Sequence, residues 1–374
     1  MNYTRREFGK LAFAVPAAAL TPAWVLGQTR PNSKIEGVQI GTITYSYRSM
    51  LDQSAEATLK CIVDSGISAI ELMGGPVESF AGAPTTGGGR AAGGGRGRAG
   101  GGREGSAGSG PDSATLTAKW NGVACAPARR GDEPAPAGAG RRGGGRGEMT
   151  PEQQSAQQEQ AAKLKAWRTS VSMDPFKKLR KMYNDAGVTI YAWKQLSTNM
   201  SDEEIEYIFN VAEALGCTHT TLELPTDPAQ LKRLGDFAVK KKIHAAYHTH
   251  TQGSMTAFDQ AFAISKGNMA NVDFGHWVAA GNVGGTPLQF LEKYHDRISS
   301  FHLKDRTKPE HCALNLPWGK GETPIREILQ LVKKNRWNIP ASIELEYDIP
   351  EGSDAVKEVG KCVEYCRNAL TART

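Results

Sequence analysis

Short apolar runs alternate with longer amphipathic stretches along most of the chain. Runs of four to six mostly apolar residues predict strands, and eight such runs occur, at Val38–Ile43, Ala69–Leu72, Val188–Ala192, Thr220–Leu224, Ile243–His248, Asn271–Phe274, Ile298–His302 and Ala341–Leu345. Helical spacing of apolar residues is found between them, over Glu56–Ser65, Pro151–Ala186, Asp202–Leu215, Pro228–Lys241, Met255–Ser265, Pro287–Tyr294 and Thr323–Lys334. This alternation is typical of βαβ units and a parallel sheet.

Eight strands with helices between them predict an α/β fold, a single (β/α)₈ TIM barrel over residues 37–83 and 151–370. The stretch between these two parts, residues 84–150, is rich in Gly, Ala, Arg and Pro. It has too little apolar surface to offset the entropy lost on ordering. We therefore expect a disordered insertion in the loop after the second strand, on the face where barrels tolerate long loops.

The first residues have the features of an export signal. Arg5 and Arg6 precede an apolar run from Leu11 to Leu26, as in a twin-arginine signal peptide. The alternative, a membrane anchor, is disfavoured because the run contains two prolines and is shorter than the roughly 20 residues that a span needs. We expect residues 1–28 to direct export by the twin-arginine translocase to the periplasm or cell envelope, without a stable membrane span.

The net charge of +6 is unevenly distributed along the chain. Residues 84–150 contribute +5 and residues 1–28 contribute +2, which leaves −1 for the predicted barrel. A near-neutral barrel gives no reason to expect a nucleic acid partner, and the Arg-Gly tract lacks the interleaved aromatic residues of RNA-binding segments. The six cysteines include no Cys-x-x-Cys pair and are too sparse for a disulfide scaffold.

Acids, histidines and lysines gather where the predicted strands end. They are Glu71, Lys194, Glu223, His248, His250, Asp273, His276, His302, Lys304, Asp305, Glu344 and Glu346. Strand ends of a TIM barrel converge on one site, where carboxylates and imidazoles repel or are poorly solvated unless a cation joins them. Mixed nitrogen and oxygen ligands suit one divalent ion of Mn, Zn, Co, Fe or Mg.

Several short motifs resemble one protein family. They are Tyr-His-Thr-His at 247–250, Asp-Phe-Gly-His-Trp at 273–277, His-Leu-Lys-Asp at 302–305, Trp-Gly-Lys-Gly-Glu-Thr-Pro at 318–324 and Ile-Glu-Leu-Glu at 343–346. Their order and spacing resemble the xylose-isomerase-like TIM barrels, the sugar phosphate isomerase/epimerase group that includes inosose dehydratases and ketose 3-epimerases. The resemblance covers residues 37–83 and 151–370.

The resemblance implies a ligand set for one divalent metal. Family members use a Glu, an Asp, a His and a Glu from strands five to eight, and the last three match Asp273, His302 and Glu344. The strand-five position is His248, which departs from the family's Glu, so Glu223 could supply the missing carboxylate. His250 and Glu346 lie two residues away from matched positions, on the same faces of their strands, and are rival ligands.

Metal-assisted proton abstraction beside a carbonyl is the chemistry that the resemblance implies. Candidate bases are Glu223 and Glu344, with His276 or His250 as proton shuttle. We expect the other site residues to contact a small carbohydrate: Lys304 and Lys194 as donors to its oxygens, Glu71 and Glu346 near its hydroxyls, and Trp277 stacked on a sugar face.

The reaction itself stays open at this point. Isomerisation or epimerisation of a sugar is the first interpretation. Because His248 replaces one of the paired glutamates of the epimerases, dehydration or elimination of a keto-sugar or inosose is the second. A non-catalytic sugar-binding barrel is a third.

An apurinic endonuclease is disfavoured, because it would need three zinc ions and a basic groove. No phosphate-binding glycine loop is evident, so an unphosphorylated substrate is favoured. A homo-oligomer is possible.

Overall fold

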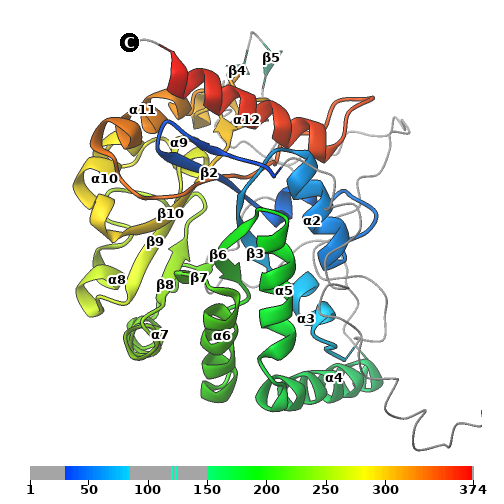
Figure 1. Ribbon diagram of the computed structural model, residues 1–374. Coiled ribbons are helices and arrows are strands. Elements are labelled where there is room, and N and C mark those ends of the chain that lie inside the picture. Colours follow the sequence, from blue (N-terminus) through cyan, green and yellow to red (C-terminus); the bar gives the residue numbers. More distant parts are fainter. Residues whose placement is uncertain (1–29, 85–118, 121–122, 125–149, 373–374) are drawn as a thin grey trace, which may run out of the picture.

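Eight parallel strands close into a barrel (Figure 1). The computed structural model describes residues 30–84, 119–120, 123–124 and 150–372. The barrel strands are β2 (Val38–Ile43), β3 (Ala69–Met73), β6 (Thr189–Lys194), β7 (His219–Glu223), β8 (His244–His248), β9 (Asn268–Asp273), β10 (Ile298–Leu303) and β13 (Ala341–Ile343). Because β2 pairs with both β3 and β13, the sheet has no open edge. The predicted (β/α)₈ barrel is confirmed.

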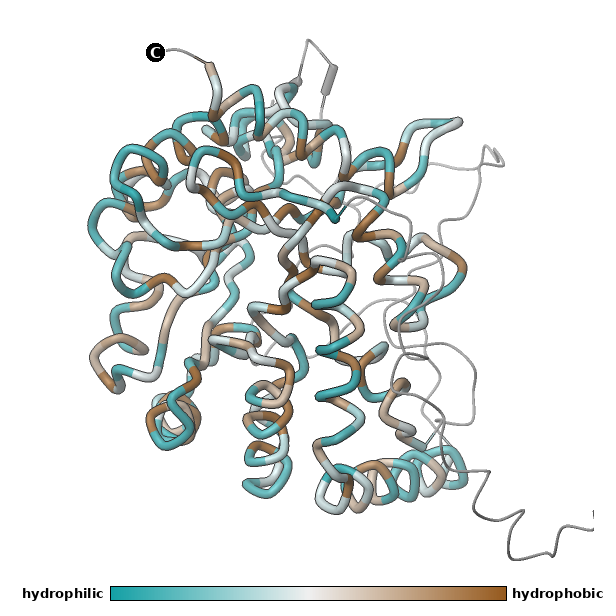
Figure 2. The backbone as a smooth tube through the Cα atoms, viewed as in Figure 1, coloured by the Kyte–Doolittle hydropathy of each residue, from teal (hydrophilic) through white to brown (hydrophobic). Residues whose placement is uncertain are grey.

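Helices surround this barrel and cover its outer face (Figure 1). They are α2 (Ala55–Asp64), α3 (Gly74–Phe80), α4 (Pro151–Ser170), α5 (Asp174–Asp185), α6 (Asp202–Leu215), α7 (Pro228–Lys241), α8 (Asp259–Ile264), α9 (Phe274–Ala279), α10 (Pro287–Tyr294), α11 (Ile325–Asn335) and α12 (Ala355–Thr371). Hydrophobic and hydrophilic positions alternate within their turns (Figure 2). Except in α4, where Arg168 is the one buried residue, their apolar sides face the barrel and supply most of the core.

Shorter elements decorate the barrel. Strand β1 (Lys34–Ile35) pairs antiparallel with β2, β4 (Lys119–Trp120) with β5 (Val123–Ala124), and β11 (Asp305–Arg306) with β12 (Asn315–Leu316). Single 3₁₀ turns are η3 (Thr44–Tyr47), η4 (His295–Arg297) and η5 (Pro309–His311).

Some predicted boundaries are wrong. The single helix expected over 151–186 is two helices, α4 and α5, separated by Val171–Met173. Pro175 lies in the first turn of α5, where its missing N–H removes no helical hydrogen bond, whereas inside one continuous helix it would remove one. The helix expected over 255–265 is confined to α8, and the eighth strand ends at Ile343, two residues earlier than expected.

Two predicted segments lie largely or wholly outside the described residues. The signal peptide, residues 1–28, is wholly outside them, and so is the insertion at 84–150 apart from its ends and the strands β4 and β5. Among the described helices, none combines the length and apolarity that crossing a membrane requires. Cys61, Cys217, Cys362 and Cys366 are buried and free, whereas Cys312 is disulfide-bonded.

One carboxylate fixes the loop that follows β11 and β12. Asp305 Oδ2 accepts the backbone N–H groups of Gly319, Lys320 and Gly321, at 2.8, 3.1 and 2.8 Å. A Cβ atom at Gly321 would lie 2.3 Å from Asp305 Oδ1, so only glycine allows this approach. The Trp-Gly-Lys-Gly-Glu-Thr-Pro loop is therefore held at the C-terminal end of the barrel.

Candidate metal centre

Four predicted metal ligands lie together at the C-terminal ends of consecutive strands. His248 ends β8, Asp273 ends β9, His302 lies near the end of β10, and Glu344 directly follows β13. One ligand atom from each side chain lies within 4.8 Å of the others. All four residues are buried. We call these four residues the ligand cluster.

Asp273 uses its two carboxylate oxygens in different ways. Oδ1 accepts the backbone N–H of His276 at 2.7 Å and so caps helix α9. Oδ2 is buried and makes no hydrogen bond within the described part of the chain, but lies 3.1 Å from the Lys304 ammonium. Burial, opposed by Lys304 and reinforced by Glu344, raises the pKa of Asp273 to about 6. The helix cap thus orients the carboxylate and leaves one oxygen for a cation.

Lys304 brings a positive charge to the edge of the ligand cluster. Its Nζ lies close to three carboxylate oxygens: Glu346 Oε2 at 2.6 Å, Glu344 Oε2 at 2.9 Å and Asp273 Oδ2 at 3.1 Å. Burial alone would lower the pKa of Lys304, but these carboxylates outweigh it and raise the pKa. A Cβ at Gly275 would lie 2.2 Å from Lys304 Cγ, so a glycine at that position leaves room for the Lys304 side chain.

His302 lies between two carboxylates. Its Nδ1 is 2.8 Å from Glu344 Oε2 and its Nε2 is 2.8 Å from Glu71 Oε2. Burial alone would lower the pKa of His302, but Glu71 and Glu344 raise it to about 10. Without a metal, the imidazole is therefore held as a cation that compensates the surrounding carboxylates.

His248 is a neutral imidazole with an unused nitrogen. Its Nδ1 is buried and has no hydrogen-bond partner among the described residues. Burial, together with the cations Lys194 and His302, holds the pKa of His248 well below its ordinary value. A buried nitrogen without a partner is costly, and a neutral imidazole is the form that binds a metal.

The composition of the ligand cluster fits a divalent metal. Two imidazoles and two carboxylates without a thiolate form a donor set that Mn²⁺, Fe²⁺, Co²⁺ and Zn²⁺ accept. The unpaired nitrogen of His248 and Oδ2 of Asp273 are donors that a cation between them would satisfy. The buried cluster is thus consistent with a metal site, and its donors do not single out one ion.

Glu223 lies outside the ligand cluster, in a more exposed group with Lys194 and His250. Its Oε1 is 3.1 Å from Lys194 Nζ and its Oε2 is 3.1 Å from His250 Nδ1. Its side chain is 50% exposed, against 21% for Lys194 and 24% for His250. Burial of the carboxyl group raises the pKa of Glu223, but Lys194 and His250 outweigh it, and the net shift is downward. These three side chains are accessible to a small molecule.

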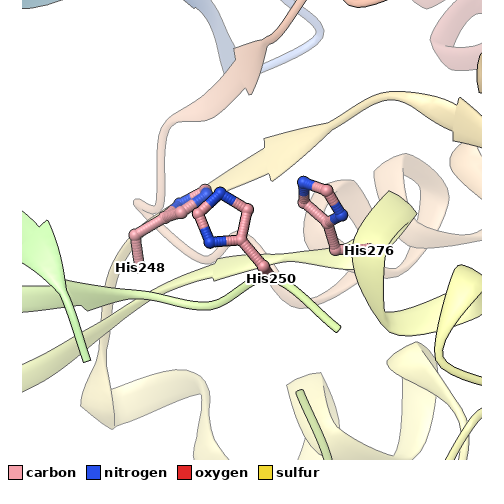
Figure 3. Close-up of side chains that lie close together, drawn as sticks. All are labelled: His248, His250 and His276. Atoms are coloured by element: carbon pink, nitrogen blue, oxygen red, sulfur yellow. The ribbon is translucent and has the colours of Figure 1, made fainter. Parts of the chain in front are cut away.

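A second group of possible ligands consists of His248, His250 and His276 (Figure 3). The ring centroids of His250 lie 5.0 Å from His248 and 4.7 Å from His276. However, Arg306 Nη1 lies 2.6 Å from His276 Nδ1, and Lys304 Nζ lies 3.0 Å from His276 Nε2. Burial and these two cations hold the pKa of His276 well below its ordinary value. Cations at both ring nitrogens make this group less suited to a metal than the ligand cluster.

Two predicted substrate contacts are fully buried. Trp277 donates from Nε1 to the Gly285 carbonyl at 2.9 Å and packs with Phe290, with ring centroids 4.9 Å apart. Its exposed fraction is 0%, so its position is that of a core residue and not of a sugar-stacking one. Glu71 is also 0% exposed and is hydrogen-bonded inside the barrel. Glu346 keeps 22% exposure and lies beside Lys304.

Sequence reasoning missed three polar residues that support the site. Arg306 contacts His276, while Thr221 and Asn271 donate to Glu71. Each lies two positions from a predicted site residue. Because alternate residues of a strand share a face, this spacing is the signal that could have identified them.

Comparison with known families agrees with this geometry. Residues 170–366 match the model of the family described as "Xylose isomerase-like TIM barrel". The chain belongs to this family. As a xylose isomerase-like TIM barrel, it has the fold that the resemblance implied. Among curated proteins, no sequence matches it.

Solved structures share the barrel at low sequence identity. A sugar phosphate isomerase/epimerase from Parabacteroides distasonis is 14% identical, with a TM-score of 0.52, over 90% of this chain and 96% of that one. A probable 3-DHS dehydratase from Bacillus anthracis is 12% identical, with a TM-score of 0.50, over 90% of this chain and 100% of that one. At such identities the likeness concerns the fold alone.

Proposed function

We propose that this protein is a metal-dependent enzyme of the sugar isomerase/epimerase type, which removes a proton next to a carbonyl group of a small carbohydrate. One divalent ion would be held by His248, Asp273, His302 and Glu344. The observation that carries the proposal is the ligand cluster itself: four buried ligand residues at adjacent strand ends, two of which have an atom without a hydrogen bond to any described residue. Membership of the xylose isomerase-like family supports the same chemistry.

A metal bound there would supply Lewis acidity to the carbonyl and the neighbouring hydroxyl of the substrate. The chain's own residues supply the remaining functions. The Lys304 ammonium lies between the carboxylates of Asp273, Glu344 and Glu346 and compensates their charge at the edge of the site. Lys194 is placed to donate a hydrogen bond to a substrate oxygen at the exposed side of the site.

Proton transfer is best assigned to His250 with Glu223. A carboxylate beside Nδ1 orients an imidazole, and His250 Nδ1 lies 3.1 Å from Glu223 Oε2. The other candidates are less suited. Glu344 has its pKa held well below the ordinary value, since the cations Lys304 and His302 outweigh the effect of burial. His276 meets cations at both ring nitrogens. Both would accept a proton poorly.

Elimination is the second candidate reaction. Epimerases of the family use two metal-bound glutamates as opposed acid and base, and His248 occupies the position of one of them. With a single acid/base pair, His250 and Glu223, proton removal followed by loss of a β-hydroxyl or β-alkoxy group needs no second glutamate. A keto-sugar, inosose or keto-glycoside would then be the substrate of a lyase or dehydratase.

A substrate screen in deuterated water tests this proposal. The chain without residues 1–28, loaded with Mn²⁺, Co²⁺ or Zn²⁺, is incubated with ketoses, inososes and 3-keto-glycosides, and NMR follows the products. Deuterium next to the carbonyl without elimination supports an isomerase or epimerase, and release of water or alcohol supports the lyase. Glu223→Gln should reduce either reaction without loss of metal. A metal-loaded protein that exchanges no proton in any of these substrates contradicts the proposal.

We also propose that the protein is exported by the twin-arginine pathway, because Arg5 and Arg6 precede an apolar run of suitable length. The test replaces both arginines by lysine and compares cell fractions. Accumulation of the variant in the cytoplasm, with the unaltered chain in the envelope fraction, supports export. Equal distribution of the two contradicts it.

A further inference from the structure

Glu71 occupies an interior position that a substrate does not reach. It lies in β3, and its side chain is 0% exposed. Three side chains from three other strands surround its carboxylate. Thr221 Oγ1 donates to Oε1 at 2.6 Å, Asn271 Nδ2 donates to Oε2 at 2.9 Å, and His302 Nε2 lies 2.8 Å from Oε2. Both oxygens are therefore occupied by residues of the barrel itself.

Glu71 is an acceptor without a proton of its own. Thr221 donates to Oε1 and Asn271 donates to Oε2, so each oxygen of the Glu71 carboxyl group already accepts a hydrogen bond. A carboxylate in this state can only accept from His302, so the hydrogen of that contact belongs to His302 Nε2.

The other ring nitrogen of His302, Nδ1, faces the remaining residues of the ligand cluster. Nδ1 lies 2.8 Å from Glu344 Oε2 and 4.0 Å from Asp273 Oδ2. An imidazole that keeps its hydrogen on Nε2 can offer a lone pair only at Nδ1. Nε2 is thus hydrogen-bonded to Glu71 inside the barrel, and Nδ1 is the ring atom that is left to bind a metal.

We propose that Glu71 is a positioning residue that holds the hydrogen of His302 on Nε2 and thereby presents Nδ1 to the metal. The inference rests on the proposed metal centre and assigns Glu71 a role different from the sugar contact expected from the sequence. A carboxylate behind a histidine ligand fixes the tautomer and the ring orientation and makes the ligand more basic. Loss of such a partner weakens metal binding by about 10- to 100-fold.

The test compares two substitutions of buried glutamates. Glu71→Gln removes the charge, and its amide nitrogen cannot accept a hydrogen bond. Glu78→Gln is the matched control, because Glu78 is also buried, at 7% exposure, but contacts Arg168 and not the ligand cluster. The dissociation constant for Mn²⁺ is measured by titration calorimetry on the metal-free chain without residues 1–28, with circular dichroism to verify folding.

We expect Glu71→Gln to raise the dissociation constant by about 10- to 100-fold and Glu78→Gln to leave it within about twofold of the wild type. Unchanged affinity in Glu71→Gln, with tight binding by the wild type, overturns the role of Glu71 and leaves the metal centre standing. Failure of the wild type to bind any divalent ion overturns both.

A second measurement is made on the wild-type protein itself. In the Zn²⁺-loaded wild type labelled with ¹⁵N-histidine, NMR distinguishes the two ring nitrogens of His302, which His302→Gln assigns among the eight histidines. We expect a hydrogen on Nε2 and, at Nδ1, a ¹⁵N chemical shift that the bound metal has changed. A hydrogen on Nδ1 with the metal at Nε2 contradicts the inference.

Discussion

Two buried ionic clusters in this protein differ in how completely their charges are paired. On the outside of the barrel, Arg168 of α4 binds both oxygens of Glu78, at 2.8 and 3.1 Å, and also Glu204 Oε1, at 3.1 Å. Tyr207 and Gln195 add hydrogen bonds to Glu78 at 3.2 Å each. At the barrel end, a nitrogen of His248 and an oxygen of Asp273 in the ligand cluster have no hydrogen bond to any of the described residues.

This difference separates a structural cluster from a binding site. Charges taken out of water persist only where partners compensate them, and the Arg168 cluster is complete without a ligand. In the ligand cluster, the carboxylates are compensated by Lys304 and by a proton on His302, whose pKa is raised to about 10. A divalent cation would replace that proton. We therefore expect the two clusters to respond to different perturbations.

The largest expected effect comes from His302→Ala. The substitution removes a ligand atom and should cost several kcal/mol of transition-state stabilisation, which corresponds to a decrease in kcat/KM of about a thousandfold or more. Metal content, measured on the purified variant, should fall with activity. Full metal occupancy in His302→Ala would contradict its role as a ligand.

Next in size is the effect of breaking the outer cluster. Arg168→Ala leaves Glu78 buried without its cation and should lower the free energy of unfolding by about 3–5 kcal/mol. Urea denaturation measures this change. Mn²⁺ affinity of the folded variant should stay that of the wild type, because no contact joins Arg168 to the ligand cluster among the described residues. A parallel loss of metal affinity would show that the two clusters are coupled.

A third buried imidazole, His219, shows how burial changes the pKa of a histidine that lies outside both clusters. Among the described residues, its ring nitrogens contact Thr218 Oγ1 at 2.8 Å and Ser300 Oγ at 2.9 Å and no carboxylate, and burial lowers its pKa to about 4. Its neutral form stabilises the fold above pH 6.5, and this stability is lost as the pH falls towards 4. The loss should reach about 3 kcal/mol.

Urea denaturation between pH 4 and 7 measures that loss. His219→Gln serves as the control, since it removes the titrating group and should flatten this part of the pH dependence. An equally steep decrease in the variant would mean that another group causes the acid sensitivity.

The smallest effect is that of metal removal on stability. At a free metal concentration of 100 times the dissociation constant, binding should add about 2.7 kcal/mol to the free energy of unfolding. Calorimetric Tm values with and without EDTA measure this increment. Glu78→Gln should lower both Tm values and leave their difference unchanged. A Tm that does not respond to EDTA in either protein would contradict a metal bound to the native state.

The sequence predicts the barrel because its eight apolar runs and helical stretches repeat in a regular order. It misses the break between α4 and α5, although Pro175 provides a local signal for it. The predicted residues His248, Asp273, His302 and Glu344 come together since each ends or follows a neighbouring strand.

The contacts between side chains could not be predicted in the same way. The hydrogen bond from His302 to Glu71 joins β10 to β3, which are not neighbours in the barrel. Such a contact depends on how the strands are staggered around the closed sheet, and no local pattern encodes that. The same holds for Lys304, which three carboxylates from β9 and the segment after β13 surround.

The metal content of the purified chain tests the central claim most directly. The chain without residues 1–28 is produced with added Mn²⁺, Co²⁺ or Zn²⁺, passed through gel filtration, and analysed by inductively coupled plasma mass spectrometry beside the double variant Asp273→Asn, Glu344→Gln. We predict one tightly bound divalent ion per wild-type chain and almost none in the variant. No bound ion in the wild type, or equal amounts in both proteins, would contradict a metal centre at the ligand cluster.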